Sequence, residues 1–399
     1  MPDRARRPDP AVVEREIARL RATGLSKWTT YPGAIGSFIA EADFGTAPAV
    51  TRVVREHAER GDFGYPARHH RQELARAARD WFADRYDWHV DEASVGIVPD
   101  VLASLRFAIA HLTRPGSAVV VPTPNYMPFL RLPADLGRRV VQVPGHRGDD
   151  GRWQLDLDGI GRALDDGAGL VVLTNPANPT GTVHTRDELR ALAALVERHD
   201  ARVWADEVHA PIRYDGAVHV PFASLSETTA RHTVTATSAS KAWNIPGLKA
   251  AQTIFTNPDD LDAWHGVGLW TEHETSLLGM TASTAAYREG GAWLDDLVAR
   301  LAHLRDVLVE RVTERIPAAR IDRPQATYLA WLDLRDIVGD RRLGPFLRRH
   351  ANLAATDGRY CGDAFTGYLR LNIATPEPIA VETVDRLADA LDTLPGRAD

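Results

Sequence analysis

Lysine is scarce in this chain of 399 residues. Of its 47 basic residues 44 are arginines, and the lysines are Lys27, Lys241 and Lys249. Two of them lie eight positions apart in the stretch TSASKAWNIPGLK, residues 237–249. A lysine can lose its proton and react as a neutral amine, whereas an arginine guanidinium stays protonated. This stretch therefore indicates a site that needs an amine.

Cysteine and long apolar runs are almost missing as well. The single Cys361 excludes an intramolecular disulfide framework and fits a reducing cytosol. No motif around it supports a catalytic thiol. The charged, proline-rich start MPDRARRPDP has no apolar core after it, so we expect no signal peptide. Runs such as 118–121 and 169–173 are far shorter than the ~20 residues of a membrane helix. We expect a soluble, cytoplasmic protein without membrane contact.

Motifs for nucleic acids, nucleotides and metals are also missing. The net charge is −7 and acids and bases are interspersed, which leaves no basic surface for a nucleic acid. There is no G-x-x-x-x-G-K-[ST], and GVG at 266–268 lacks the third glycine and the preceding strand of a dinucleotide fingerprint. HETS, residues 273–276, is not H-E-x-x-H, and no Cys/His cluster offers a metal site.

The middle of the chain alternates between predicted strands and helices. Short apolar runs that end in turn residues predict buried parallel strands at 117–122, 169–176, 201–207 and 233–240. Between the second and third runs, Thr185 and Glu188 form a capping box, and Leu189, Leu192, Leu195 and Val196 make one apolar stripe. Strand, crossover helix and strand in this order predict an α/β fold with a parallel sheet that is covered on both faces.

The C-terminal third has a different pattern. Two helical segments flank two strand-like ones, which predicts a smaller α+β lobe; they are 293–315, 381–394, 327–334 and 368–374. We expect the first fifty residues to lie across both lobes. The predicted division is an N-terminal arm at 1–50, a large domain at 51–290 and a small domain at 291–399.

Polar side chains follow three of the predicted strands. They are Asn175, Asn178 and Gly181 after the second run, Asp206 and His209 after the third, and Ser238, Ser240 and Lys241 after the fourth. Singly, these could be a proline-stiffened turn, a helix N-cap and a solvated lysine. Jointly they indicate one polar site, because ligands of open parallel sheets bind beyond the carboxyl ends of the strands.

A lysine at a strand end, with serines before it and a carboxylate on a neighbouring strand, is what a pyridoxal 5'-phosphate (PLP) site needs. The amine of Lys241 can form an imine with the cofactor. The carboxylate of Asp206 can hold a proton on the pyridine nitrogen, so that the ring accepts electrons. Hydroxyls and a second cation can hold the phosphate, and Lys249 is that cation.

Four segments in this order, NPANPTG, DEVH, SASKAWNIPGLK and RLNIA, resemble the fold-type-I PLP enzymes of the class I/II aminotransferase family over about residues 30–390. The branch that the chain most resembles is that of the cystathionine β-lyase-type C–S lyases. KWTTYP, FGYP, PNYMPF, TYLAWLD and YLRLNIATP carry this second likeness. The resemblance implies a large domain with a mainly parallel seven-stranded sheet flanked by helices, plus a smaller α+β domain. His209 favours the lyases, because aminotransferases more often have tyrosine there.

Two blocks depart from the branch. AEADF at 40–44 stands where the branch has Ala-Asp-Met-Asp-Phe. In NPANPTGT, Ala177 replaces a histidine and Thr182 an arginine. Both blocks border the substrate side, so the identity of the substrate stays open.

The resemblance also implies roles for individual residues. Lys241 would form the imine and then act as the base at Cα, which requires a pKa well below the ~10.4 of free lysine. The other cofactor contacts would be Asp206 at the ring nitrogen, Asn178 and His209 at the 3'-oxygen, Tyr126 on the ring face, and Ser238, Lys249 and the backbone of Asp100 and Val101 at the phosphate. The Asp100 side chain should turn away from that phosphate.

The substrate would be held by Arg370 through its α-carboxylate. The segment 36–44, with Ala42, and Tyr126 would line the pocket for its side chain. Tyr65 would reach the phosphate of the neighbouring subunit, which implies a homodimer with shared active sites.

Three functions are compatible with these residues. The favoured one is β-elimination of a thiol from cystathionine or another cysteine S-conjugate, giving pyruvate and ammonia. The alternative is an aminotransferase that works on an amino acid and a keto acid. The third is a PLP-binding regulatory protein without turnover, although the chain before residue 30 is too short for a helix-turn-helix module.

Overall fold

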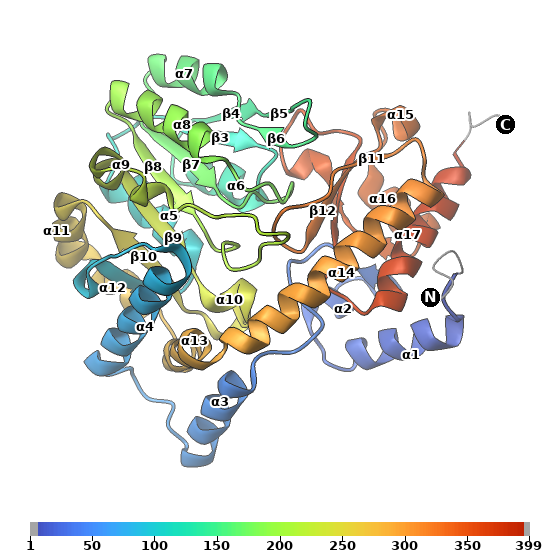
Figure 1. Ribbon diagram of the computed structural model, residues 1–399, viewed down its shortest axis with the longest axis horizontal. Coiled ribbons are helices and arrows are strands. Elements are labelled where there is room, and N and C mark those ends of the chain that lie inside the picture. Colours follow the sequence, from blue (N-terminus) through green and yellow to red (C-terminus); the bar gives the residue numbers. More distant parts are fainter. Residues whose placement is uncertain (1–6, 395–399) are drawn as a thin grey trace.

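A seven-stranded sheet is the centre of the large lobe in the computed structural model, which describes residues 7–394 (Figure 1). In spatial order the strands are β2 (Val95–Val98), β10 (Ala251–Phe255), β9 (Thr233–Thr237), β8 (Arg202–Asp206), β7 (Leu170–Thr174), β3 (Val119–Thr123) and β4 (Val140–Pro144). Four of them are the strands predicted from the apolar runs. The α/β fold with a mainly parallel sheet is confirmed.

Strand β10 runs opposite to the rest. The pairs β3–β4, β3–β7, β7–β8 and β8–β9 are parallel, whereas β10 is antiparallel to both β9 and β2. The start of β10 therefore lies at the same edge of the sheet as the carboxyl ends of the other strands. This reversal was not predicted from the sequence.

Helices cover both faces of the sheet. Val120 and Val171 belong to a buried cluster with α7 (Leu157–Asp165) and α8 (Arg186–Arg198). Their neighbours Val119 and Leu170 belong to a second cluster with α5 (Val101–His111) and α6 (Met127–Asp135). Successive side chains of a strand point to opposite faces, so coverage of both faces explains the continuous apolar runs.

Helix α8 begins as the sequence predicts. The Thr185 hydroxyl accepts a hydrogen bond from the Glu188 N–H at 3.2 Å, and the Glu188 carboxylate accepts one from the Thr185 N–H at 3.3 Å. Leu189, Leu192 and Val196 are buried, while Leu195 is half-buried. The capping box and the apolar stripe are confirmed.

The small lobe is built on an antiparallel sheet of four strands. In order they are β11 (Arg320–Ile321), β12 (Leu329–Asp333), β15 (Tyr368–Asn372) and β14 (Thr356–Asp357), and the principal helices are α14 (Gly291–Arg315), α16 (Leu343–His350) and α17 (Glu377–Asp392). On β15, Leu369 and Leu371 are packed in the core with these helices. Arg370 lies between them and therefore points to the opposite face, towards the large lobe.

The N-terminal segment contacts both lobes. Helix α1 (Pro10–Arg21) packs against α17 (Figure 1). Strand β1 (Ile35–Gly36) pairs with β13 (Leu353–Ala354) of the small lobe. The Ala42 N–H donates to Asn244 of the large lobe at 2.9 Å. Within residues 7–394 no helix is long and apolar enough to cross a membrane.

The third lysine, Lys27, stabilises the N-terminal segment. Lys27 is buried and donates to a carboxylate oxygen of Asp43 at 2.8 Å and to the carbonyl oxygen of Glu41 at 3.0 Å. The indole N–H of Trp28 donates to the other oxygen of Asp43 at 2.8 Å. These bonds tie the segment around Glu41, next to the Ala40 described below, to residues 27–28 of the N-terminal segment.

Candidate active site

A cavity of about 250 Å³ opens at the sheet edge where the parallel strands end and β10 begins. Its walls come from the turns after β2, β3, β7, β8 and β9, and from the N-terminal segment. The lining residues used below are Ala40, Asp100, Val101, Tyr126, Asn178, Asp206, His209, Ser238, Ser240, Lys241 and Lys249. The structure thus brings together most of the side chains that the sequence analysis assigned to one site.

Lys241 lies in the short helix α10 (Ala239–Ala242), just after β9. Its ammonium donates a hydrogen bond to the carbonyl oxygen of Ala40 at 2.9 Å. Burial lowers the pKa of Lys241 to about 8, the charge of Glu41 acts against this, and the charge of Arg370 adds to it. Roughly a tenth of this amine is therefore unprotonated at pH 7, far more than of a free lysine with a pKa of ~10.4, and the neutral form is the one that acts as a nucleophile or base.

Asp206 is the last residue of β8 and is 4% exposed. Its carboxylate accepts a hydrogen bond from the Val208 N–H at 3.2 Å. Burial raises the pKa of Asp206 to about 7, because that bond and the charge of Lys241 do not offset the loss of water. An N–H donor in the cavity would favour the ionised carboxylate.

His209 also lines this cavity. Burial lowers the pKa of His209 to about 3, and the charges of Lys241 and Arg370 act in the same direction. The imidazole is therefore neutral at physiological pH. Its Nδ1 has no hydrogen-bond partner within residues 7–394.

Arg370 joins the small lobe to the large one. Its Nη1 donates to the amide oxygen of Asn178 at 3.1 Å, and its Nη2 donates to the carbonyl oxygen of Phe38 at 2.7 Å and to the hydroxyl of Thr356 at 3.2 Å. The Nε of this buried side chain has no partner in the described part of the chain. With its oxygen engaged, Asn178 has its amide N–H groups to offer to a ligand.

Tyr126 is placed by the neighbouring asparagine. The Tyr126 N–H donates to the amide oxygen of Asn125 at 2.7 Å, and the Thr174 hydroxyl donates to the same oxygen at 2.9 Å. The tyrosine ring also packs edge-on against Phe129 with 5.2 Å between the ring centres. Two strand ends, those of β3 and β7, thereby position this side chain at the cavity.

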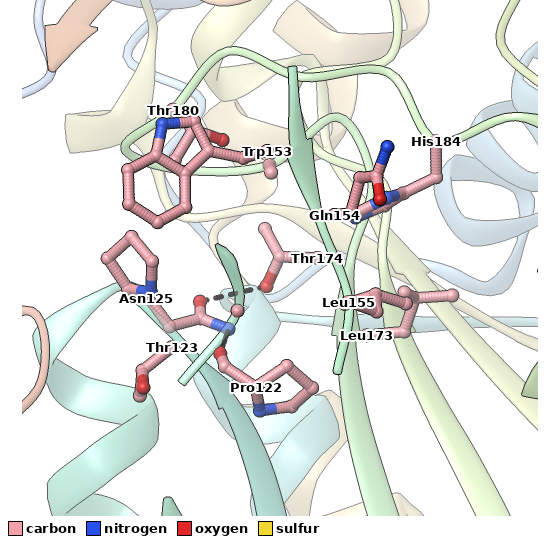
Figure 2. Close-up of a pocket in the computed structure, with 13 residues that line it drawn as sticks. Pro122, Thr123, Asn125, Trp153, Gln154, Leu155, Leu173, Thr174, Thr180 and His184 are labelled. Atoms are coloured by element: carbon pink, nitrogen blue, oxygen red, sulfur yellow. Dashed lines mark hydrogen bonds between the residues drawn. The ribbon is translucent and has the colours of Figure 1, made fainter. Parts of the chain in front are cut away.

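A second, smaller cavity of about 30 Å³ lies beside this asparagine (Figure 2). Figure 2 shows the bonds of Asn125 to Thr174 and Pro122 at its wall, opposite Trp153. Ala177, which the resemblance places at a histidine position, also lines it. The volume suffices for about one water molecule. It contains no lysine, arginine or carboxylate, so we assign the chemistry to the larger cavity.

The far end of the large cavity carries the groups predicted for a phosphate. Asp100 caps α5 and accepts a hydrogen bond from the Ala103 N–H at 2.9 Å, and its second oxygen forms a close ion pair with Lys249. The Ser238 hydroxyl donates to the carbonyl oxygen of Ala250 at 2.8 Å and accepts from the Ser240 N–H at 3.0 Å. Lys249 reaches this end because it stands just before the reversed strand β10.

Three predicted residues are not part of the cavity wall, and one of them, Arg370, reaches it only through its bond to Asn178. Ala42 is buried and its backbone is bonded to Asn244, while Ala40 provides the lining. Tyr65 is 85% exposed and stacks on His273 with 5.4 Å between ring centres.

Sequence reasoning placed Ala40 (within the segment 36–44) and Ser240 at this site but gave no individual contact to either of them or to Tyr328. Ala40 acts through a backbone carbonyl, which leaves no signal in a sequence. The buried Tyr328 donates to that same carbonyl at 3.0 Å. Its segment TYLAWLD supported the family resemblance but gave no role. Ser240 was noted after its strand and was not assigned a contact.

Residues 36–391 match the family model described as aminotransferase class I and II. The chain belongs to this family. A cystathionine β-lyase from Corynebacterium glutamicum is 36% identical over 94% of this chain and 99% of its own length. Cystathionine β-lyase PatB from Bacillus subtilis is 31% identical over 85% of this chain and 88% of its length. The structure of a PLP-bound C–S lyase from Staphylococcus hominis has a TM-score of 0.86 at 25% identity and covers 94% of this chain and 97% of that one. The predicted family and branch are confirmed.

The cavity of this class I and II family member fits PLP. It holds the buried Lys241 amine of lowered pKa, the buried Asp206 carboxylate and the unpartnered Nδ1 of His209, and its wall residue Asn178 is bonded to Arg370, whose Nε is also unpartnered within residues 7–394. A pyridinium, a phenolic oxygen and a substrate carboxylate would satisfy these groups. Within residues 7–394 no cluster of three or more His, Cys, Asp or Glu could hold a metal ion.

Proposed function

We propose that this chain is a PLP-dependent C–S lyase that eliminates a thiol from Cβ of cystathionine or a related cysteine S-conjugate. The products are the thiol, pyruvate and ammonia. The observation that carries the proposal is one cavity lined by the Lys241 amine and the Asp206 carboxylate, with the Arg370 guanidinium bonded to Asn178 of its wall, in a chain with cystathionine β-lyases among its relatives. His209 supports the lyase branch of the family.

PLP supplies a carbonyl carbon that reacts with amines and a ring that accepts electrons from Cα. Asp206 would contact the ring nitrogen, Asn178 and His209 the 3'-oxygen, and Tyr126 the ring face. Ser238, Lys249 and the backbone N–H groups at the start of α5 would hold the phosphate, where the helix dipole favours an anion.

Lys241 carries the proton chemistry. With a pKa near 8, its amine can take the proton from Cα and keep it within the cavity. The protonated amine is stabilised by its hydrogen bond to the Ala40 carbonyl oxygen, which lies 2.9 Å from the Lys241 nitrogen. Burial of the surrounding residues excludes water that would compete for this proton.

Arg370 orients the substrate. Its unpartnered Nε offers a charged N–H donor to an α-carboxylate. Burial lowers the pKa of Arg370 from its usual value, yet a guanidinium keeps its charge at any physiological pH. The same side chain orients Asn178, so carboxylate binding and cofactor contact depend on one residue.

The experiment is turnover of L-cystathionine by the PLP-loaded protein without any added keto acid. We expect pyruvate, ammonia and thiol in equal amounts over many turnovers, with none from Lys241→Ala. An aminotransferase would instead stop after one equivalent and leave pyridoxamine phosphate until a keto acid is supplied. A protein that binds PLP and turns over neither way would be a regulatory member of the family.

We also propose that the protein is a homodimer whose sites are completed by Tyr65 of the partner. Exposed apolar side chains support an interface at this face; they are Phe63, Tyr65, Val267, Leu269 and Trp270, which are between 45% and 85% exposed. Sedimentation should give a dimer at micromolar concentration. Mixing Tyr65→Phe with Lys241→Ala protomers should restore part of the activity, and a monomer would refute the proposal.

A cytoplasmic location is part of the same proposal. It rests on the sequence, in which one cysteine leaves no intramolecular disulfide to form. Burial also raises the pKa of the Cys361 thiol to about 11, so this cysteine stays protonated and unreactive.

A further inference from the structure

The predicted phosphate end of the cavity contains a carboxylate. Asp100 and Lys249 both line the cavity, and they form a close ion pair with each other. The other oxygen of Asp100 accepts the Ala103 N–H at the start of α5. The Asp100 side chain therefore contacts both Lys249 and the N-terminus of α5, the two features that would attract a phosphate.

A phosphate placed here would meet two effects of this carboxylate. It would compete with Asp100 for the ammonium of Lys249. It would also lie next to a like charge, which raises the free energy of the bound state. Both effects have the same sign, since each weakens the binding of a phosphate monoester.

We propose that Asp100 sets the affinity for the cofactor by acting as an internal competitor for its phosphate group. In the cofactor-free protein, Asp100 engages Lys249 and the start of α5. Binding of a phosphate monoester breaks the ion pair and transfers Lys249 to the phosphate. This inference rests on the PLP function proposed above and adds a residue that opposes loading.

The geometry allows the exchange without a change of fold. The side chains of Asp100 and Lys249 are 38% and 50% exposed, so both have solvent into which they can rotate. The bond from Ala103 goes to the oxygen of Asp100 that does not contact Lys249, so the cap can persist while the ion pair opens. The expectation that Asp100 turns away from the phosphate applies to the loaded state, whereas in the structure it faces Lys249.

The test measures binding by cofactor-free protein, so it does not depend on lyase activity. Inorganic phosphate is titrated by the rise of the thermal midpoint, and PLP by quenching of tryptophan fluorescence. We expect Asp100→Asn to bind both ligands about two- to fivefold more tightly, the range for half-exposed charge pairs. Asparagine keeps the capping oxygen, and Asp100→Ser, which also caps, should change the affinity in the same direction.

The matched control is Asp156→Asn. Asp156 caps α7 through the Gly159 N–H at 2.8 Å and lies 3.7 Å from an arginine, Arg162, so it has the same chemistry outside the cavity. Its variant should bind both ligands as the unmodified protein does. Unchanged or weaker binding by the Asp100 variants, or equal tightening by Asp156→Asn, would overturn the proposal. Loss of lyase activity alone would not bear on it.

Discussion

Replacing Asp206 by asparagine should make the cofactor-free protein more stable and the loaded enzyme nearly inactive. The two side chains have the same shape, and asparagine keeps an oxygen to accept the Val208 N–H. What it removes is a carboxylate that is 4% exposed. The substitution therefore separates the free-energy cost of burying the Asp206 charge from the role of that charge in catalysis.

The size of the stability effect follows from the pKa of Asp206, which burial raises from 3.8 to about 7. A carboxyl whose pKa is higher in the folded state destabilises the fold once the pH exceeds its unfolded value. The penalty grows until the pH reaches the folded value and is constant above it. At 1.36 kcal/mol per pKa unit, a shift of roughly three units corresponds to on the order of 4 kcal/mol. Asparagine cannot ionise and carries no such penalty.

The assay is thermal denaturation of both cofactor-free proteins between pH 5 and pH 9. The midpoint of Asp206→Asn should exceed that of the unmodified protein by an amount that widens from pH 5 to about pH 7 and then stays constant. With PLP bound, the neutral amide cannot hold the ring proton, so kcat should fall on the order of 100-fold or more.

Two results would refute this reasoning. A stability difference that does not change with pH would mean that Asp206 is not a destabilised acid in the cofactor-free protein. A normal kcat in the variant would mean that Asp206 is a cap or packing residue. Asp156→Asn serves as the control, because it removes a carboxylate that caps a helix outside the cavity.

Three further predictions concern other parts of the molecule. In cofactor-free protein, competitive labelling with acetic anhydride should give Lys241 a midpoint near pH 8, and a midpoint near that of free lysine would contradict its burial. Arg370→Lys should lower kcat/KM by roughly 10- to 100-fold, because hydrogen bonds to charged groups contribute ~1.5–3 kcal/mol; steady-state kinetics with unchanged kcat/KM would remove its assigned role. Asp385→Ala removes the carboxylate that the buried Arg311 contacts at 2.9 Å, while its bond to Glu314 at 3.1 Å stays, so chemical denaturation should show a loss of about 3 kcal/mol, the lower end of the range for a broken buried pair, and a loss below 1 kcal/mol would contradict it.

The features that sequence reasoning predicted well are local. The strand that ends in Asp206 and the capping box of Thr185 and Glu188 depend on residues within a few positions of each other, so propensity and periodicity are enough to find them. The place of Asp206 in the site also follows, because the carboxyl ends of parallel strands share an edge.

The features that it missed depend on distant parts of the chain. The direction of β10 is decided by its pairing with β2 and β9, and no residue within β10 encodes it. The Lys241 amine donates its hydrogen bond to the carbonyl of Ala40, some two hundred positions earlier in the chain. Every residue has a backbone carbonyl, so the residue type at position 40 does not indicate this contact. The ion pair of Asp100 with Lys249 joins two turns that meet at the sheet edge through the reversal of β10.

The reversal of β10 has a consequence for how this chain can evolve. Lys241 and Lys249 both lie in the link between β9 and β10, and the pairing of Thr237 with Gln252 fixes the two ends of that link. The ring of PLP is rigid and a single CH2–O group joins the phosphate to it, so the distance from its reactive carbon to its phosphate varies little and cannot adapt to a much longer or shorter link. Insertions and deletions, which surface loops usually tolerate, should therefore be excluded here. The length of this segment is under the same constraint as the identity of its two lysines.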